Sequence, residues 1–167
     1  MSPRPVVGFD LDGVLSNFIG PYQIISSLLQ DVGVAHARDL SDQEGEGILR
    51  AALNPILAAT LHDPTDYYGD LPADVFDKTF GFIERFDIAF WSHLPSLVSN
   101  DDRLHMVGLS AYYDMHYITS RRGNRSLVQE ATFQWLQNNG LPIEGLDRIH
   151  VVGAKGQTAY AMGMSTF

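Results

Sequence analysis

The chain has 167 residues, 45% of them hydrophobic, and a formal net charge of −9. This size and composition exclude a globally disordered protein and suit one buried core, or a small core with an inserted subdomain. The acidic balance argues against nucleic acid polymers and anionic membrane surfaces as partners, because both repel a negatively charged chain. The absence of cysteine excludes disulfide frameworks and thiolate metal sites.

The first apolar stretch, residues 6–9, is short and leads directly into Asp10 and Asp12. The two acids interrupt it, so it is neither a signal peptide nor a membrane span, and we expect a cytoplasmic protein with no membrane partner. A short apolar run that ends in polar residues is typical of a buried parallel strand. We therefore expect residues 6–9 to form a strand that carries Asp10 at its carboxyl end.

Residues 18–95 do not continue in the rhythm of strand and helix. Helical patterns occur near residues 22–30, 48–61 and 74–85, and the joints at 39–47 and 63–72 are rich in Gly, Pro and Asp. The acidic run 39–46 is most simply a solvated loop. This part of the chain is interpreted as a mostly helical insertion between the first strand and the rest of the sheet.

The remaining residues alternate between helical and strand patterns. A helix is expected over residues 100–112, and apolar runs at 115–118 and 149–152 predict two further strands. Ser126 and Gln129 form a capping-box pair for a helix that ends at residues 138–140, and residues 155–162 predict another helix. A fourth strand is expected to begin at Met164. The alternation indicates an α/β fold with a doubly wound parallel sheet.

Polar side chains follow three of these predicted strands. They are Asp10 and Asp12, Thr119 and Ser120, and, just beyond Gly153, Lys155. Open parallel sheets place their sites at the carboxyl ends of the strands, so these groups are expected to converge. An aspartate can attack phosphorus while a second acid protonates the leaving oxygen, with Mg²⁺ holding the first ionised. The set therefore predicts phosphoryl transfer through an aspartyl intermediate.

Three motifs carry a resemblance to a known family. FDLDGV at residues 9–14, YITSR at 117–121 and the lysine of VVGAKGQTAYAMG resemble, in order, the first three motifs of the haloacid-dehalogenase-like superfamily. The resemblance implies a Rossmann-like core formed by residues 1–17 and 96–167, with residues 18–95 as a helical C1-type cap. The strings DLDGVLSNF and FWSHLP are similar to the 5′(3′)-deoxyribonucleotidase branch.

The resemblance implies a role for each matching residue. Asp10 would be the nucleophile and Asp12 the general acid–base, in a Mg²⁺-dependent phosphatase that acts on a small phosphorylated substrate such as a nucleoside monophosphate. Asp10 and the backbone carbonyl of Asp12 would bind the metal. The phosphate-binding residues would be Thr119, Ser120 and Lys155, and the substrate-binding residues Phe18 and Arg121.

Two departures from the family pattern leave alternatives open. The family's fourth motif, an acidic pair after the next strand, does not occur before the last residue, Phe167. Its absence predicts a truncated reading frame. The second departure is Asn17, which stands where that branch usually has Asp. One alternative is a truncated or degenerate relative that binds phosphate or a partner without turnover. Another is a phosphoacceptor domain, against which the large insertion argues. An incomplete sheet edge would favour self-association as a homo-oligomer.

The individual residues also have simpler interpretations. Asp10 and Asp12 could belong to an Asp-Gly turn with Gly13, and Thr119 could be only a loop start. Lys155 could be a solvated lysine, although a cation at a helix N-terminus opposes the helix dipole. Arg121 could be a solvated loop charge, and the aromatic residues near Phe18 could be core of the cap.

Overall fold

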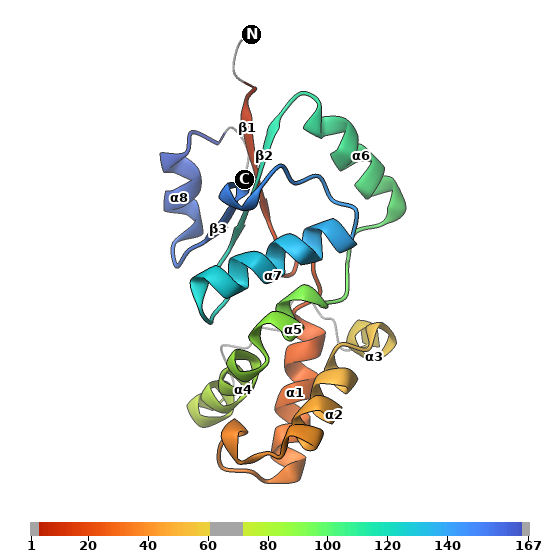
Figure 1. Cartoon of the computed structure of the whole chain (residues 1–167), viewed down its shortest axis with the longest axis vertical. Helices are drawn as coiled ribbons and strands as arrows, with labels where there is room; N and C mark the ends of the chain where they lie inside the picture. The colour runs from red at the N-terminus through yellow and green to blue at the C-terminus, as the bar shows by residue number, and fades with distance from the viewer. Residues whose placement is uncertain (1–3, 61–71, 165–167) are drawn as a thin grey trace.

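Three parallel strands, in the order β1-β2-β3, form the sheet of the computed structural model, which describes residues 4–60 and 72–164 (Figure 1). They are β1 (Val6–Asp10), β2 (Asp114–Thr119) and β3 (Ile149–Val151). All three were expected from their apolar runs. In the register, Asp10 of β1 lies beside Ile118, and Thr119 of β2 lies beside Val151. The carboxyl ends of the three strands therefore share one edge of the sheet.

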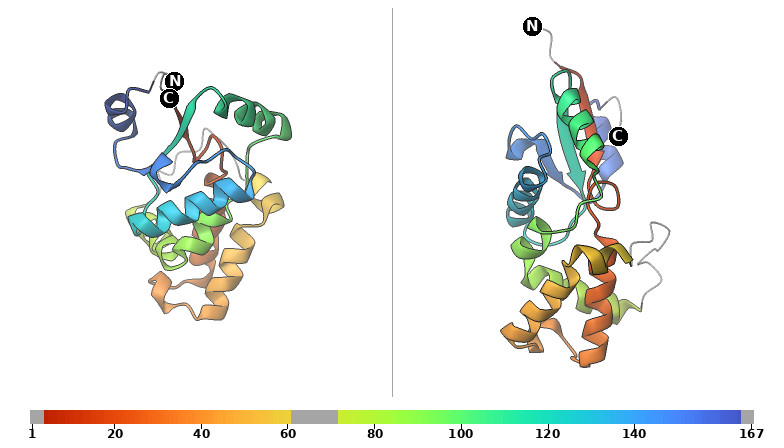
Figure 2. Two further views of the ribbon diagram at one scale, coloured as in Figure 1. Left: turned by 45° about the horizontal axis from the view of Figure 1, so that its top comes forward. Right: turned by 90° about the vertical axis from the view of Figure 1, so that its right-hand side faces the viewer.

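Helices cover both faces of this sheet. They are α7 (Arg125–Asn138) and α8 (Lys155–Ala161), and Figure 2 shows them on opposite sides of the strands. The middle strand is the most deeply buried, and its Tyr117 donates a hydrogen bond to the Pro142 carbonyl, just beyond α7. A third helix, α6 (Asn100–Ser110), starts with a capping box of Ser99 and Asp102 and precedes β2 in the chain. The described residues thus form a mixed α/β fold, as the sequence predicted.

The expected start of α7 needs a correction. The capping-box pair Ser126 and Gln129 does not begin the helix, because Asn124 is the N-cap and its side chain accepts from the backbone amides of Ser126 and Leu127. Asparagine is as strong an N-cap as serine, and here it stands two residues earlier. Gln129 instead donates to the carbonyls of Leu146 and Ile149, so it ties α7 to the start of β3.

Between β1 and α6 the described residues are mostly helical, and these helices form one bundle below the sheet (Figure 1). They are α1 (Ile19–Val32), the short 3-10 helix η1 (Ala37–Asp39), α2 (Asp42–Ala52), α3 (Pro55–Thr60), α4 (Ala73–Arg85) and α5 (Asp87–Ser92). A second 3-10 helix, η3 (Leu146–Arg148), precedes β3. We call residues 18–95 the helical insertion. Part of the joint expected at 63–72, and the strand expected after Met164, lie outside the described residues.

Two predictions within the helical insertion were wrong. The acidic run 39–46 is not a loop, because Ser41 and Glu44 form a capping box and start α2 at Asp42. The single helix expected over residues 48–61 is interrupted after Ala52, and a separate helix starts at Pro55, whose ring removes a backbone donor. Arg85 of α4 bonds to Asp42 and to two carbonyls near η1, which holds the acidic end of α2 in place.

The helical insertion and the sheet share one hydrophobic core. The largest fully buried side chains include Trp91, Tyr22 and Phe82 from the insertion and Trp135 and Tyr117 from the sheet region. Helix α5 of the insertion packs along α7. Its fixed position brings Trp91 to the carboxyl end of β2. None of the described helices is long and apolar enough to cross a membrane.

The two connections between the sheet and the helical insertion run side by side. Ser16 and Ser96 form an antiparallel bridge. The amide of Asn17 donates to the Pro95 carbonyl at 2.8 Å, and the amide of Leu97 donates to the Leu15 carbonyl at 2.8 Å. These bonds place the start of the insertion beside its end, directly below the carboxyl edge of the sheet.

Candidate active site

Asp10 and Lys155 meet at the carboxyl edge of the sheet, although 145 residues separate them in sequence. Asp10 is the last residue of β1, and Lys155 is the first residue of α8, which follows β3 after a short loop. The ammonium Nζ lies 2.7 Å from one carboxylate oxygen and 2.9 Å from the other. Both side chains are partly exposed, at 24% for Lys155 and 32% for Asp10. The pair therefore offers an accessible carboxylate beside a cation.

Asp12 is presented by a tight turn directly after β1. Gly13 adopts a positive φ of 84°, which suits glycine because it has no Cβ, and its amide donates to the Ser16 carbonyl. The amides of Leu15 and Ser16 both donate to the Leu11 carbonyl at 2.8 Å. This turn directs Asp12 toward the end of β2, where Thr119 and Arg121 lie.

The Asp12 carboxylate accepts hydrogen bonds from three side chains. Arg121 donates from Nε at 3.1 and 3.2 Å to the two oxygens and from Nη2 at 2.8 Å to Oδ1. The hydroxyl of Ser16 donates to Oδ1 at 2.8 Å, and that of Thr119 donates to Oδ2 at 2.9 Å. Both oxygens are therefore occupied by donors, in an ion pair whose guanidinium is fully buried and whose carboxylate is 17% exposed.

Two opposing effects set the pKa of Asp12. Burial raises the pKa because it disfavours the charged carboxylate, whereas the positive charge of Arg121 and the hydrogen bonds from Arg121, Ser16 and Thr119 lower it. The lowering effects dominate, so the pKa of Asp12 lies below that of an ordinary aspartate. At neutral pH the Asp12 side chain is a carboxylate in this arrangement and can accept a proton.

Arg121 also contacts residues other than Asp12. Its Nη1 donates to the Thr132 hydroxyl of α7 at 2.9 Å, and Nη2 also donates to the Ser16 hydroxyl at 3.2 Å. The guanidinium lies over the ring of Trp91, 4.9 Å from its centroid. One face of the guanidinium and all three of its nitrogens are thus used within the protein.

The structure brings some of the predicted site residues together and separates others. Asp10 pairs with Lys155, and Asp12 pairs with Thr119, whose hydroxyl is buried. Ser120 follows Thr119 and is exposed at the same strand end. Phe18 is 5% exposed and packs among Tyr22, Phe80, Phe90 and Trp91.

Sequence reasoning missed Ser16 as a partner of Asp12, and Trp91 and Thr132 as partners of Arg121. It also placed Arg121 toward the substrate, whereas the structure places it on Asp12. One signal was available for Arg121. Side chains two residues apart in an extended segment point to the same side, so Arg121 follows the direction of Thr119. Ser16 lies only four residues after Asp12 in the same turn. For Trp91 and Thr132 the sequence carries no comparable signal, because only the tertiary fold brings them to Arg121.

The described residues can supply few ligands to the Mg²⁺ that the family resemblance implies. Among residues 4–60 and 72–164, no three His, Asp or Glu side chains are grouped so as to hold a metal ion. Both oxygens of Asp12 are engaged by side chains, and the Asp10 carboxylate already faces the Lys155 ammonium. The oxygens that could still bind a metal are those of Asp10, shared with Lys155, and the Asp12 main-chain carbonyl. Mg²⁺ keeps several waters and often takes one or two carboxylates together with substrate phosphates. The described residues could therefore supply only a small part of the ligands of such an ion.

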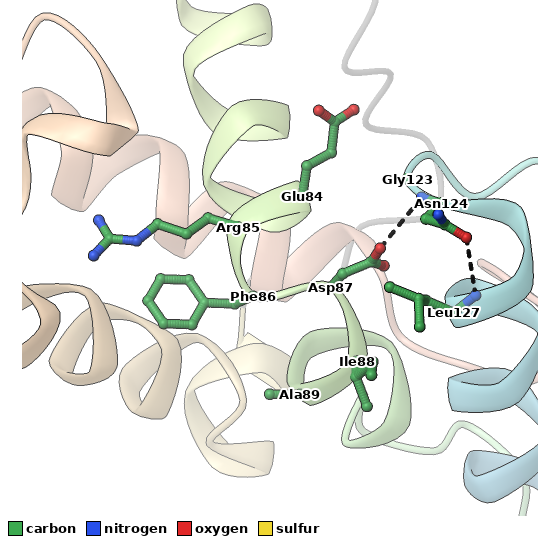
Figure 3. A pocket seen from close by; sticks show the side chains of 9 residues that line it. All are labelled: Glu84, Arg85, Phe86, Asp87, Ile88, Ala89, Gly123, Asn124 and Leu127. Atoms are coloured by element: carbon green, nitrogen blue, oxygen red, sulfur yellow. Dashed lines mark hydrogen bonds between the residues drawn. The ribbon is translucent and has the colours of Figure 1, made fainter.

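A separate groove of about 740 Å³ lies on the side of α5 and the N-terminus of α7 (Figure 3). The residues that line it are Glu84, Arg85, Phe86, Asp87, Ile88, Ala89, Gly123, Asn124 and Leu127. Figure 3 shows Asp87 directed at Gly123 and Asn124, whose amide donates to Asp87 at 3.3 Å. Asp10, Asp12 and Lys155 do not line this groove, so it is distinct from the site at the strand ends.

No protein-family model matches the chain, and no curated protein matches it.

Proposed function

We propose that the chain is a Mg²⁺-dependent phosphomonoesterase of the haloacid-dehalogenase-like type, in which Asp10 is the nucleophile. The observation that carries the proposal is the pairing of Asp10 with Lys155 at the carboxyl edge of a parallel sheet, two residues before a second acid. A nucleophilic carboxylate, a neighbouring cation for phosphate oxygens and a general acid–base are the groups that this chemistry needs.

The first chemical step forms a covalent intermediate. One oxygen of Asp10 attacks phosphorus, and the bond between phosphorus and the leaving oxygen breaks with its electron pair on that oxygen. Asp12, in its protonated form, gives its proton to the leaving oxygen, which departs as an alcohol. The ammonium of Lys155 lies where it offsets the negative charge of the phosphoryl oxygens. The exposed hydroxyl of Ser120 and that of Thr119, once it turns from Asp12, would bind the same group.

The second step releases phosphate. The Asp12 carboxylate takes a proton from water, whose oxygen attacks phosphorus, and the bond from phosphorus to Asp10 breaks. Asp10 is then a carboxylate again and Asp12 is protonated for the next cycle. The lowered pKa of Asp12 favours the carboxylate form that this step uses. A magnesium ion at Asp10 and the Asp12 carbonyl would neutralise phosphate charge.

The same proposal assigns the parts of the chain. Residues 1–17 and 96–167 are the core, and the helical insertion is a C1-type cap, supported by the side-by-side connections at Ser16 and Ser96. The resemblance of DLDGVLSNF and FWSHLP to deoxyribonucleotidases suggests nucleoside monophosphates as substrates. In this assignment Phe18 belongs to the aromatic packing of the cap, and its substrate contact stays a prediction.

Phosphate release from a panel of monophosphates, including deoxyribonucleoside monophosphates, tests the proposal. With Mg²⁺, the wild-type protein is expected to turn over at least one of them, and Asp10→Asn is expected to be inactive. Asp31→Asn, which removes an exposed aspartate of α1, is the matched control and should retain activity. Activity that survives Asp10→Asn contradicts the mechanism.

A second candidate is a protein that binds phosphate without turnover. It is favoured by the engagement of both Asp12 oxygens, which disfavours the protonated form needed to release an alcohol. It is also favoured by the small number of metal ligands among the described residues. Two results together would support this candidate. Calorimetry would show that the protein binds inorganic phosphate and that Lys155→Met does not, and no monophosphate would release phosphate in the activity assay. Turnover of roughly 1 s⁻¹ or more excludes it.

A further inference from the structure

The Arg121 side chain uses its whole donor fork on one small group of partners. Two of its nitrogens face Asp12, and the third donates to Thr132 on α7. The guanidinium is planar and rigid. The hydrogen bonds to Thr132 and Ser16 therefore also fix the orientation of the N–H groups that donate to Asp12. A lysine ammonium, a point charge on a flexible stem, cannot reproduce this geometry.

Asp12 nevertheless keeps contact with the open side of the site. Its side chain is 17% exposed, while that of Arg121 is completely buried behind it. The arrangement therefore places the arginine away from the substrate and the carboxylate toward it. Arg121 is suited to orient the acid–base group and is poorly placed to contact substrate itself.

The helical insertion reaches this arrangement through Trp91. The indole is 1% exposed and stacks on the ring of Phe18, with centroids 5.6 Å apart. It also lies under the guanidinium of Arg121. Its Nε1 donates to the backbone carbonyl of Arg122 at 3.2 Å, so the ring is fixed to the segment that follows β2. A shift in how the insertion packs would move Trp91 and, with it, Arg121.

We propose that Arg121 is the positioning residue for Asp12, and that Trp91 makes this positioning depend on the packing of the helical insertion. This inference rests on the proposed function, because it assigns Asp12 a proton-transfer role. Proton transfer by a placed side chain contributes about 10²–10⁴-fold, and small misplacements cost about 10²-fold. Loss of the Arg121 fork should therefore lower kcat and leave KM little changed.

The experiment measures kcat, KM and the urea unfolding midpoint for wild type, Arg121→Lys, Arg121→Gln and Trp91→Phe. Trp135→Phe is the matched control, since Trp135 is equally buried and also donates through Nε1, to the Leu94 carbonyl at 2.6 Å. Both arginine variants are expected to lose about 100-fold in kcat. Trp91→Phe is expected to lower kcat by about tenfold, a partial loss of the same effect, whereas Trp135→Phe changes only the midpoint.

A rescue measurement separates positioning from general destabilisation. Millimolar guanidinium ion is expected to raise kcat of Arg121→Ala, because the free cation can occupy the position beside Asp12, and to leave Asp10→Asn inactive. If Arg121→Ala does not fold, the lysine variant and Trp91→Phe still decide the question.

Three results would overturn the proposal. Folded arginine variants with wild-type kcat would show that Arg121 does not position the acid–base group while the phosphatase function stands. A rise in KM at constant kcat would make Arg121 a substrate-binding residue instead. A wild-type protein with no turnover of any monophosphate would remove the proposed function, and the positioning role would fail with it.

Discussion

Lys155 Nζ is shared between the two carboxylate oxygens of Asp10, at 2.7 and 2.9 Å, and so joins the start of α8 to the end of β1. Lys155→Met is expected to lower kcat/KM by about 10²–10³-fold, because a positioned donor to developing charge is lost. Lys78→Met alters the chain's other lysine, which lies on α4, and serves as the control. Steady-state kinetics on the best monophosphate provides the measurement. Unchanged kinetics in Lys155→Met would remove this residue from the site.

The buried ion pair between Arg121 and Asp12 predicts a strong effect on stability. Arg121→Met leaves a desolvated carboxylate without its cation and is expected to cost about 3–5 kcal/mol of unfolding free energy. The double variant Asp12→Leu/Arg121→Met should recover most of that loss, because no charge is then left buried. Urea denaturation at neutral pH measures both variants. Equal losses in the single and double variants would refute a net cost from the orphaned charge.

His150 predicts a loss of stability in mild acid. Its ring lies against that of His116, with Nδ1 of His116 2.8 Å from Nε2 of His150. Burial lowers the pKa of His150, positive charge on His116, Arg125 and Arg148 lowers it further, and Asp147 opposes them. The unfolded chain therefore binds a proton more readily, and stability is lost as pH falls from about 6.5, the ordinary histidine pKa.

The measurement for this prediction is the urea midpoint of wild type and His150→Gln between pH 7.5 and pH 5.5. The variant is expected to lose less stability over this range than the wild type. His105→Gln, at an exposed position on α6, should follow the wild-type curve. Parallel curves for His150→Gln and wild type would contradict the prediction.

The burial of Asp87 predicts that stability changes with pH in the direction opposite to that expected for His150. It is 9% exposed, and its Oδ1 has no hydrogen-bond partner among the described residues (Figure 3). Burial raises the pKa of Asp87 and the charge of Glu84 adds to this, whereas the Asn124 amide and the Trp91 side chain oppose it; the raising effects dominate. The folded state therefore holds the proton more tightly, so stability falls as pH rises from about 3.9, the ordinary aspartate pKa.

Asp87→Asn removes this buried charge. The change that it causes in the unfolding free energy is expected to be about 1 kcal/mol more favourable at pH 7 than at pH 4. Urea midpoints at the two pH values give the comparison, with Asp77→Asn, an exposed site on α4, as the control. The prediction fails if the Asn variant is less stable than wild type by the same amount at both pH values.

The sheet and the convergence of Asp10 with Lys155 could be predicted because they depend on local signals. Residues 6–9 are apolar and bounded by acids, and parallel strands bring their carboxyl ends to one edge whatever lies between them. The same rule placed Thr119 next to Asp12. No knowledge of the helical insertion was needed for these predictions.

The helical insertion was harder to predict because tertiary contacts decide it. Helix α2 contains Gly45 and Gly47, which lower helix propensity, yet it forms. Gly45 lets the Phe86 ring pack closely, since a Cβ at this position would lie 2.6 Å from Cζ of Phe86 and the ring would have to shift. Helix α5 has only six residues, too few for a periodic pattern, and is stabilised by burial of Phe90 and Trp91.

The partner of Asp12 could not be read from the chain for a related reason. Arg121 is one of two consecutive arginines, and the sequence does not tell which is buried. In the structure Arg121 turns inward to Asp12, whereas Arg122 lies exposed over the rings of Phe76 and Phe80. Burial of an arginine requires a carboxylate at the right distance, and only the fold supplies it.

Trapping of the covalent intermediate tests the central claim most directly. Wild-type protein is mixed with a turned-over monophosphate and Mg²⁺, quenched in acid, digested and analysed by mass spectrometry. The account predicts one phosphoryl group on the peptide that contains Asp10, and none in Asp10→Asn. Phosphate release without modification of Asp10, or a phosphoryl group on another residue, would contradict it.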